Sequence, residues 1–201
     1  MVAPPLIVDS NILIGIIVVI LLGLEFLPFP PFLARKLCHS GCGACILLLD
    51  STKIKDKTFV WSVAISSIAM TWELAPFLPK FKFSRPQDVG VTGYLTLVSL
   101  WFYLELPPTI LSPVFFADPA GAVVGKFMDK CGVNFRWYKN KTFWGSIAVG
   151  VVCYWSILFE CTDLERVGIS VAAVAVEAIG AEWDNLGLAG VVLVGWKVCE
   201  K

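Results

Sequence analysis

Charged residues are scarce in this chain. Asp, Glu, Lys and Arg make up 16% of its 201 residues, against about 25% in soluble domains. Hydrophobic residues make up 57%, and the mean hydropathy is +0.78. A soluble domain needs more polar surface than this to cover its core. The sequence therefore predicts an integral membrane protein, with the lipid bilayer as a partner.

The chain also lacks a net charge, because 16 Lys and Arg balance 16 Asp and Glu. Without a basic field, the composition does not favour a nucleic-acid partner, and we expect none. The stretch from Met1 to Pro5 lacks the positively charged region that begins a signal peptide. We therefore expect the first apolar run to be a retained membrane span.

The seven cysteines lack the even, loop-borne spacing of a disulfide framework, and most lie inside apolar runs. We interpret them as small buried apolar residues. Cys42 and Cys45 have C-x-x-C spacing, but no second Cys or His pair lies near them in the sequence. A packing role is therefore favoured over redox or zinc chemistry.

Apolar runs that approach the roughly 20 residues needed to cross a bilayer recur along the chain. They cover residues 11–27, 32–49, 58–76, 90–104, 109–125, 143–159, 166–181 and 186–199. Because lipid offers no partners to backbone N–H and C=O groups, each run should be helical. The predicted fold is all-α, a polytopic membrane bundle of seven or eight transmembrane helices. Without a long linker, residues 1–201 should form a single integral membrane domain.

Basic residues are distributed unevenly between the loops of the two membrane faces. One face would hold Arg35, Lys36, Lys80, Lys82, Arg85, Lys126, Lys130, Arg136, Lys139 and Lys141, and the other Lys53, Lys55, Lys57, Arg166, Lys197 and Lys201. The positive-inside rule places the first face in the cytoplasm or the equivalent compartment of an organelle. The ER, the plastid and the plasma membrane stay open as locations.

Several ionisable residues fall inside the predicted spans, where they are energetically costly. They are His39, Glu73, Asp118 and Glu177, with Asp184 at the edge of a span. Any one of them could be a packing pair. All of them, however, lie toward the basic face, and this convergence favours a functional site.

Two basic segments could hold phosphate. Arg35 and His39 are four residues apart and share a helix face, so both would point toward one pocket. Anchoring to lipid headgroups could explain Arg35 but not His39. Arg85 and Asp88 lie where a loop enters the next helix, and Asp88 could simply be the N-cap of that helix.

Asp118 lies inside a span, with Lys126 about two turns later. Pro119 predicts a break in this helix. The stretch is not a Walker P-loop, since Ala120 replaces its first glycine and Phe127 its Ser or Thr.

Glycines accompany this carboxylate. Gly121 and Gly125 have the spacing of a close helix contact, which is compatible with a catalytic Asp118.

A further segment opens the following span with Lys139, Lys141, Thr142, Gly145 and Ser146. Backbone N–H groups at a helix start, together with Lys141, form a plausible phosphate site. Asn140 begins a glycosylation sequon, which would stay unmodified on a cytoplasmic face.

The last segment supplies oxygen ligands. Glu177, Asp184 and Asn185 carry the hard donors that suit Mg²⁺ with a bound nucleotide phosphate. Basic residues for phosphates and carboxylates for magnesium or a hydroxyl proton are the groups that phosphoryl transfer requires.

The order of these segments resembles the family of polyprenol and phytol kinases, which includes dolichol kinase and is distantly similar to CDP-lipid synthases. The matching segments run from residue 35 to residue 185. They are Arg35-Lys36 with His39 and Gly43, Arg85-Pro86 with Asp88, Gly90 and Tyr94, Asp118-Pro119-Ala120 through Gly125, Lys141-Thr142 with Gly145-Ser146, and Glu177 through Asp184-Asn185. One departure follows Lys126, where Phe127 and Met128 replace a glycine-containing turn.

The resemblance implies a membrane kinase that transfers the γ-phosphate of CTP, with Mg²⁺, to a prenyl alcohol such as phytol, farnesol or dolichol. Among these we favour phytol or another short prenol. The resemblance makes Asp118 the central carboxylate, either a magnesium ligand or the base for the alcohol; with Arg35 and His39 it is a candidate catalytic residue. The implied nucleotide-binding residues are Lys126, Lys139, Lys141, Thr142, Gly145, Ser146, Arg85 and Asp88, and the implied metal ligands are Asp118, Glu177, Asp184 and Asn185.

Two other functions stay open. The same pocket could serve a cytidylyltransferase that joins CTP to a lipid phosphate. The buried charges could also belong to a transporter or a non-catalytic scaffold, although they gather at one face and do not line a route across the membrane.

Overall fold

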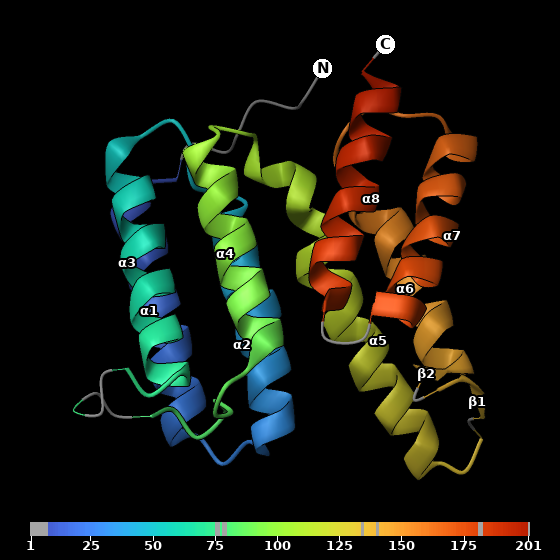
Figure 1. Ribbon diagram of the computed structural model, residues 1–201, viewed down its shortest axis with the longest axis horizontal. Coiled ribbons are helices and arrows are strands. Elements are labelled where there is room, and N and C mark those ends of the chain that lie inside the picture. The colour runs from blue at the N-terminus through green and yellow to red at the C-terminus, as the bar shows by residue number, and fades with distance from the viewer. Residues whose placement is uncertain are drawn as a thin grey trace. The chain divides into compact units, whose positions relative to one another are not determined.

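The structure is a computed structural model, and it describes residues 8–74, 77, 80–133, 135–139, 141–180 and 183–200. These residues form eight α-helices, one 3₁₀ turn and one short β-hairpin (Figure 1). The all-α prediction is confirmed, since every predicted apolar run overlaps a helix. Asn140, which begins the glycosylation sequon, lies outside the described residues.

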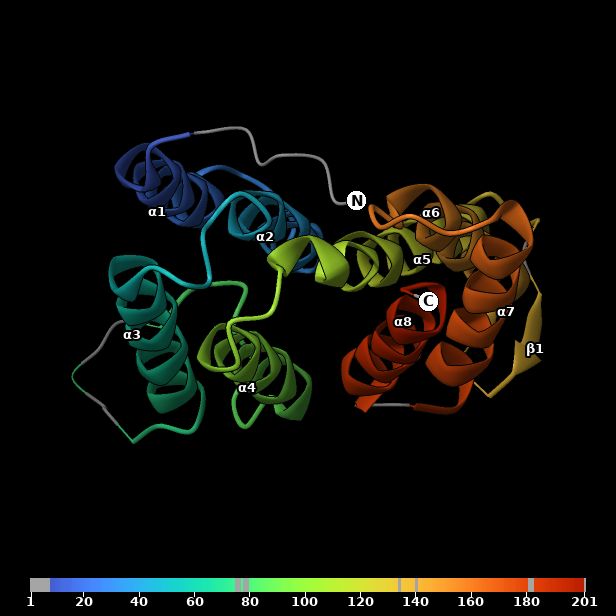
Figure 2. The ribbon, with the colours of Figure 1, turned by 90° about the horizontal axis from the view of Figure 1, so that it is seen from above.

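The described residues divide into two compact units, one that ends at Pro108 and another that begins at Thr109. The single-domain assignment of residues 1–201 stays a prediction. The first unit contains α1 (Ser10–Phe26), α2 (Pro31–Ile46), α3 (Ile54–Thr71) and α4 (Val89–Tyr103). In it α1 packs on α2, and α3 packs on α4 (Figure 2).

Short-range signals in the sequence explain where these helices begin. The carboxylate of Asp9 accepts the Asn11 N–H at 2.7 Å and caps α1. Pro31 is the first residue of α2, where its missing N–H costs nothing. Asp88 accepts the Val91 N–H at 3.0 Å, which confirms it as the N-cap of α4.

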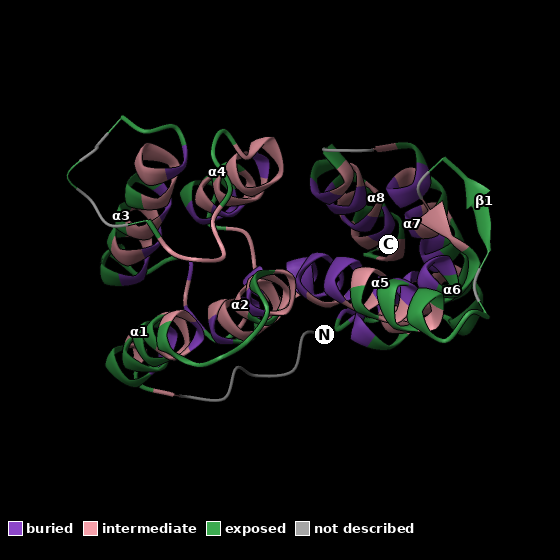
Figure 3. Cartoon of the chain, turned by 90° about the horizontal axis from the view of Figure 1, so that it is seen from below, coloured by how far each residue is buried: buried purple, intermediate pink, exposed green. Residues whose placement is uncertain are grey.

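A 3₁₀ turn, η1 (Pro108–Leu111), leads into the second unit and continues directly into α5 (Ser112–Lys130). Then come β1 (Arg136–Tyr138), β2 (Lys141–Thr142), α6 (Phe143–Ser156), α7 (Asp163–Gly180) and α8 (Asp184–Cys199). Helix α5 packs most extensively on α6, and α7 packs on both α6 and α8. Buried positions concentrate along α5, including the fully buried Val114 and Phe115 (Figure 3).

Glycines bring α5 and α6 close together. A Cβ on Gly121 would lie 2.4 Å from Val149 Cγ2, and one on Gly145 would lie 3.0 Å from the Gly121 carbonyl oxygen. A Cβ on Gly125 would lie 2.6 Å from Thr142 Oγ1. The interpretation of Gly121 and Gly125 as a helix-packing pair is therefore confirmed. The contact holds the start of α6 against the middle of α5.

Two local predictions in this unit are wrong. The expected break at Pro119 is absent, because α5 runs continuously from Ser112 to Lys130 with the proline inside it. A proline removes one N–H donor, and the buried flanks of Asp118, Pro119 and Gly121 hold the helix in place around it. The loop placement of the basic residues in this stretch is the second: Lys126 and Lys130 lie near the end of α5, and Arg136 and Lys141 lie in the antiparallel β1–β2 hairpin.

The placement of Glu73 inside a span is also wrong. Helix α3 ends at Thr71, and Glu73 lies in the following turn with a left-handed backbone (φ 57°) that cannot continue a helix. Its exposed carboxylate pairs with Lys80 at 2.5 Å. Glu73 is therefore a surface turn residue and not a buried charge.

Within the described residues, one helical segment is both long and apolar enough to cross a bilayer, Pro108–Lys130. It is 61% buried inside the protein over its most apolar window, and a buried core helix of a soluble protein meets the same criterion. Three shorter apolar helices are α1, α4 and α6.

Candidate active site

Three carboxylates from three helices meet in the second unit. Asp118 comes from the middle of α5, Glu177 from the last turn of α7, and Asp184 is the first residue of α8. Their ligand oxygens all lie within 4.8 Å of one another. Asp118 is 9% exposed and Glu177 is 8% exposed. Residues that are 59 and 66 positions from Asp118 in the sequence therefore share one largely buried acidic cluster.

Lys141 lies against this cluster. It belongs to β2, directly before the N-terminus of α6, and its Nζ donates to Glu177 Oε1. The same Nζ lies 3.6 Å from Asp184 Oδ2. Because Gly145 holds the start of α6 against α5, the backbone before α6 carries Lys141 to the carboxylates. The structure thus brings together Asp118, Lys141 and Glu177, which the sequence placed in three separate candidate segments.

Asn185 adds an amide next to the acidic cluster. Its backbone N–H donates to Asp184 Oδ1 at 2.9 Å, and the residue is 8% exposed. The side-chain oxygen Oδ1 is buried and accepts no hydrogen bond from the described residues. A buried acceptor without a donor is energetically costly. A cation bound here would remove that cost.

The donor set fits a hard divalent cation. Carboxylate and amide oxygens are the ligands of Mg²⁺ and Ca²⁺. Opposite ligands of Mg²⁺ are about 4.2 Å apart, since each lies 2.0–2.1 Å from the ion. The 4.8 Å limit of the cluster is only slightly wider, so small side-chain rotations of Asp118, Glu177 and Asp184 would close it around one ion.

The other predicted phosphate-binding residues of this unit have different surroundings. Ser146 accepts a hydrogen bond from Trp137 Nε1 at 2.9 Å, and Gly145 serves the α5–α6 contact. Lys139 is exposed, with its Nζ 5.3 Å from the ring centre of Tyr138. Lys126 is exposed on α5, and Thr142 is the N-cap residue of α6. Their predicted roles toward a nucleotide stay predictions.

The remaining predicted site residues lie in the first unit. Arg35 forms two hydrogen bonds with the Asp88 carboxylate, one of them from Nη2 to Oδ1 at 3.0 Å. The rings of His39 and Tyr94 are 4.3 Å apart at 52°. Arg35 and His39 thus connect α2 to α4, through Asp88 and Tyr94 respectively. The Arg35 guanidinium is paired with the Asp88 carboxylate.

The ion pair changes the acidity of Asp88. Burial alone would raise its pKa, but the hydrogen bonds from Arg35 and the Val91 N–H, with the charges of Arg35 and the exposed Arg85, lower the pKa below its usual value. The ionised form of Asp88 is therefore favoured in the folded protein.

Asp56 is a buried carboxylate that the sequence analysis missed. It is fully buried in the first turn of α3, where its Oδ2 accepts from Ser10 Oγ at 3.0 Å and from the Asp50 N–H at 2.9 Å. Its position among Lys53, Lys55 and Lys57 suggested an exposed loop. The contacts tie the start of α1 to the start of α3, which is a structural role.

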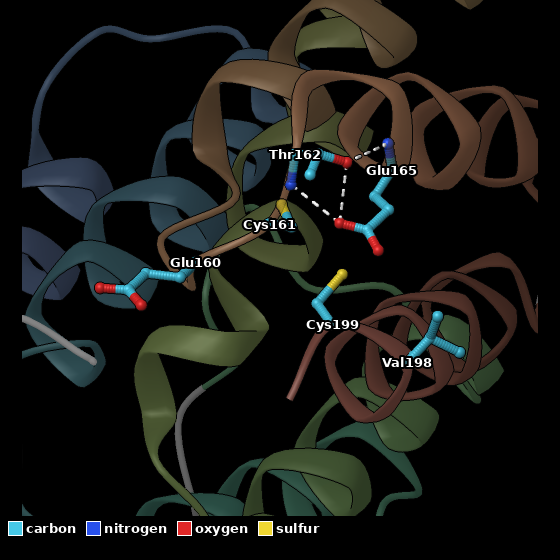
Figure 4. Close-up of a pocket in the computed structure, with 6 residues that line it drawn as sticks. All are labelled: Glu160, Cys161, Thr162, Glu165, Val198 and Cys199. Atoms are coloured by element: carbon cyan, nitrogen blue, oxygen red, sulfur yellow. Dashed lines mark hydrogen bonds between the residues drawn. The ribbon is translucent and has the colours of Figure 1, made fainter. Parts of the chain in front are cut away.

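A cavity of about 500 Å³ lies elsewhere in the second unit (Figure 4). It is lined by Glu160, Cys161, Thr162, Glu165, Val198 and Cys199. Thr162 and Glu165 form a capping box at the start of α7, with the Thr162 N–H donating to Glu165 Oε2 at 2.8 Å. None of the predicted site residues lines this cavity. Of its lining residues, Thr162 and Glu165 serve helix capping.

Comparison of the chain with protein-family models, curated proteins and solved structures returns no match.

Proposed function

We propose that this chain is a membrane-embedded kinase that transfers the γ-phosphate of CTP to a prenyl alcohol dissolved in the bilayer. One observation carries the proposal: the oxygens of Asp118, Glu177 and Asp184 lie within 4.8 Å of one another, with the Lys141 ammonium against two of them. Phosphoryl transfer needs little covalent chemistry from a protein and mainly requires positioning and compensation of charge. The site supplies groups of both signs for this purpose.

Glu177, Asp184 and Asn185 would hold magnesium, and Asp118 is either a further ligand or the base that accepts the hydroxyl proton. When bound, the ion neutralises charge on the phosphates and fixes their orientation. The Asn185 oxygen, which lacks a donor among the described residues, supports a fourth protein ligand beside the carboxylates. Lys141 would bind the phosphate oxygens, assisted by backbone N–H groups at the start of α6.

The transfer step conserves atoms and charge. The prenyl hydroxyl oxygen bonds to the γ-phosphorus, the bond from that phosphorus to the β–γ bridging oxygen breaks, and CDP leaves. The hydroxyl proton goes to a nearby carboxylate, for which Asp118 is our candidate. Products are the prenyl monophosphate and CDP.

The surfaces of the helices support a membrane location with several spans. On α1, Ile12, Ile16 and Val19 are exposed along one face, whereas another face buries Leu13 and Ile17. A helix that is apolar all round belongs in a protein core or in lipid, and this face is not covered by protein.

Helix α6 repeats the pattern. Val151 and Trp155 are exposed, Trp155 by 76%, while the buried face contains Ser146 and Ser156. An apolar outer face over a partly polar inner face suits a bilayer, whose acyl chains would also deliver the prenyl substrate. We therefore propose seven or eight spans, with the acidic cluster at the cytoplasmic or equivalent face.

A labelling experiment tests the proposal. Purified full-length protein in lipid vesicles is given phytol, farnesol or dolichol with Mg²⁺ and CTP labelled in either the α- or the γ-phosphate. The expected result is transfer of the γ label alone to the lipid. Transfer of the α label, with a lipid phosphate as acceptor, would instead identify a cytidylyltransferase. Absence of both labels from lipid with every acceptor would refute the proposal and favour a transporter or scaffold.

A further inference from the structure

Lys141 contacts the same oxygens that a divalent cation would need. Its Nζ donates to Glu177 Oε1 and lies 3.6 Å from Asp184 Oδ2, and both carboxylates belong to the acidic cluster. The Lys141 side chain is 23% exposed, so the contact is largely removed from water. Charge-assisted hydrogen bonds of this kind are stronger than neutral ones.

We infer that the Lys141 ammonium and the divalent cation compete for Glu177 and Asp184, so that the acidic cluster binds metal weakly until a nucleotide phosphate offers the lysine another anionic partner. The inference rests on the proposed function, since it takes the cluster to be the metal site of a nucleotide-dependent enzyme. It adds that the lysine regulates metal binding as well as contacting phosphate.

The charges explain why the cluster is stable both with Lys141 in contact and with a divalent cation bound. Three carboxylates within 4.8 Å repel one another, and the ammonium lowers this repulsion while no cation is bound. A divalent cation compensates the charge more fully, but it must break the lysine contacts to do so. Once Glu177 and Asp184 are ligands of the cation, the lysine needs a new acceptor. The phosphate oxygens of the nucleotide supply one within the reach of its flexible side chain.

Competition of this kind makes metal and nucleotide binding cooperative. If the nucleotide draws Lys141 away from the carboxylates, it raises their affinity for metal, and by linkage the metal raises the affinity for nucleotide by the same factor. Removing the ammonium abolishes this part of the coupling. The lysine therefore favours binding of the metal–nucleotide complex over binding of the metal alone.

The test measures Mn²⁺ binding and does not require turnover. Full-length protein in detergent micelles is titrated with Mn²⁺, and free Mn²⁺ is read from its electron paramagnetic resonance signal. The variants are Lys141→Met, Lys141→Gln and Lys141→Arg. The control is Lys130→Met, which makes the same charge change at an exposed position of α5. Circular dichroism and gel filtration confirm that each variant is folded, and either neutral variant is sufficient for the comparison.

Lys141→Met and Lys141→Gln are expected to bind Mn²⁺ about tenfold more tightly than the wild type, because a charge-assisted contact is removed from the ligands. Lys130→Met and Lys141→Arg should stay within about threefold of the wild type. CTP should tighten Mn²⁺ binding in the wild type and have a smaller effect in Lys141→Met. Equal or weaker Mn²⁺ binding by both neutral variants would overturn the inference.

The two proposals fail in different ways. If the wild type transfers the γ label but the neutral Lys141 variants bind Mn²⁺ with unchanged affinity, the kinase proposal stands and the proposed competition is wrong. If the neutral variants bind Mn²⁺ more tightly but the wild type transfers no label, the competition stands and the kinase proposal is wrong. Absence of Mn²⁺ binding in every variant, together with absence of label transfer, would overturn both.

Discussion

Arg35 and Asp88 form a doubly hydrogen-bonded ion pair across 53 residues of sequence. The pair ties the second turn of α2 to the residue that caps α4. Asp88 therefore has two partners, the guanidinium and the Val91 N–H at the start of α4. Because the pKa of Asp88 is lowered in the folded protein, this contribution to stability depends on pH.

Asp88→Asn is expected to destabilise the protein at neutral pH. In acid, the stabilities of wild type and variant should converge. Asparagine keeps the N-cap and removes only the charge. Because the pKa of Asp88 is lower in the folded than in the unfolded protein, the ion pair stabilises the fold fully above the unfolded pKa of about 3.9. This stabilisation is lost as the pH falls through the folded pKa. Unfolding temperatures of wild type and variant between pH 3 and pH 7 would measure the effect, with Asp129→Asn as an exposed control. A difference in unfolding temperature between wild type and Asp88→Asn that does not change with pH contradicts a stabilising Arg35–Asp88 ion pair.

Asp118→Asn should lower CTP-dependent lipid phosphorylation by at least about 100-fold, the magnitude typical for loss of one group that stabilises transition-state charge. The substitution conserves shape, so the fold should be intact by circular dichroism. Asp129→Asn lies in the same helix at an exposed position and should retain full activity. A fully active Asp118→Asn protein would remove this residue from the mechanism.

Lys141→Ala should raise the KM for CTP by about tenfold or more, because a charged hydrogen bond to phosphate is worth about 1.5–3 kcal/mol. Initial rates of γ-label transfer at varied CTP concentration would show it. Lys130→Ala, exposed near the end of the same unit's α5, is the matched control. An unchanged KM would mean that Lys141 does not contact the nucleotide.

Gly145→Ala should destabilise the second unit by about 1–3 kcal/mol, the usual cost of overpacking. Its Cβ would meet the Gly121 carbonyl oxygen at 3.0 Å and Thr142 Oγ1 at 2.7 Å. Gly190→Ala in α8 meets no atom within 4 Å, so it should be neutral or stabilise through helix propensity by about 0.5–1 kcal/mol. Thermal unfolding in one detergent compares the two. Equal stability of the two variants would count against close α5–α6 packing.

Val19→Arg should impair membrane insertion, whereas Phe26→Arg should be tolerated. The two residues are 69% and 81% exposed, so in water both changes would be mild. In a bilayer, Arg near the centre of a span costs about 2.5 kcal/mol or more, whereas Arg at the end of α1 can reach the headgroups. The yield of each variant in the membrane fraction distinguishes the cases. Equal yields would contradict a spanning α1.

The sequence by itself determined the helices. The runs predicted at 11–27 and 90–104 differ from α1 and α4 by one residue at each end, because apolar length, proline and N-cap residues act over a few neighbouring positions. The same local reasoning proposed Asp88 as a possible N-cap and Gly121 with Gly125 as a packing pair. It failed at Pro119 and Glu73, where burial of α5 and a left-handed turn overruled the local preferences.

Only the tertiary structure decided which charges meet. Sequence spacing cannot bring Asp118, Glu177 and Asp184 within 4.8 Å, because that distance depends on how α5, α7 and α8 pack. Nor could it pair Lys141 with Glu177, 36 residues away, or Arg35 with Asp88. Side chains far apart along the chain are neighbours only because close contacts such as the one between Gly121 and Gly145 fix where each helix lies.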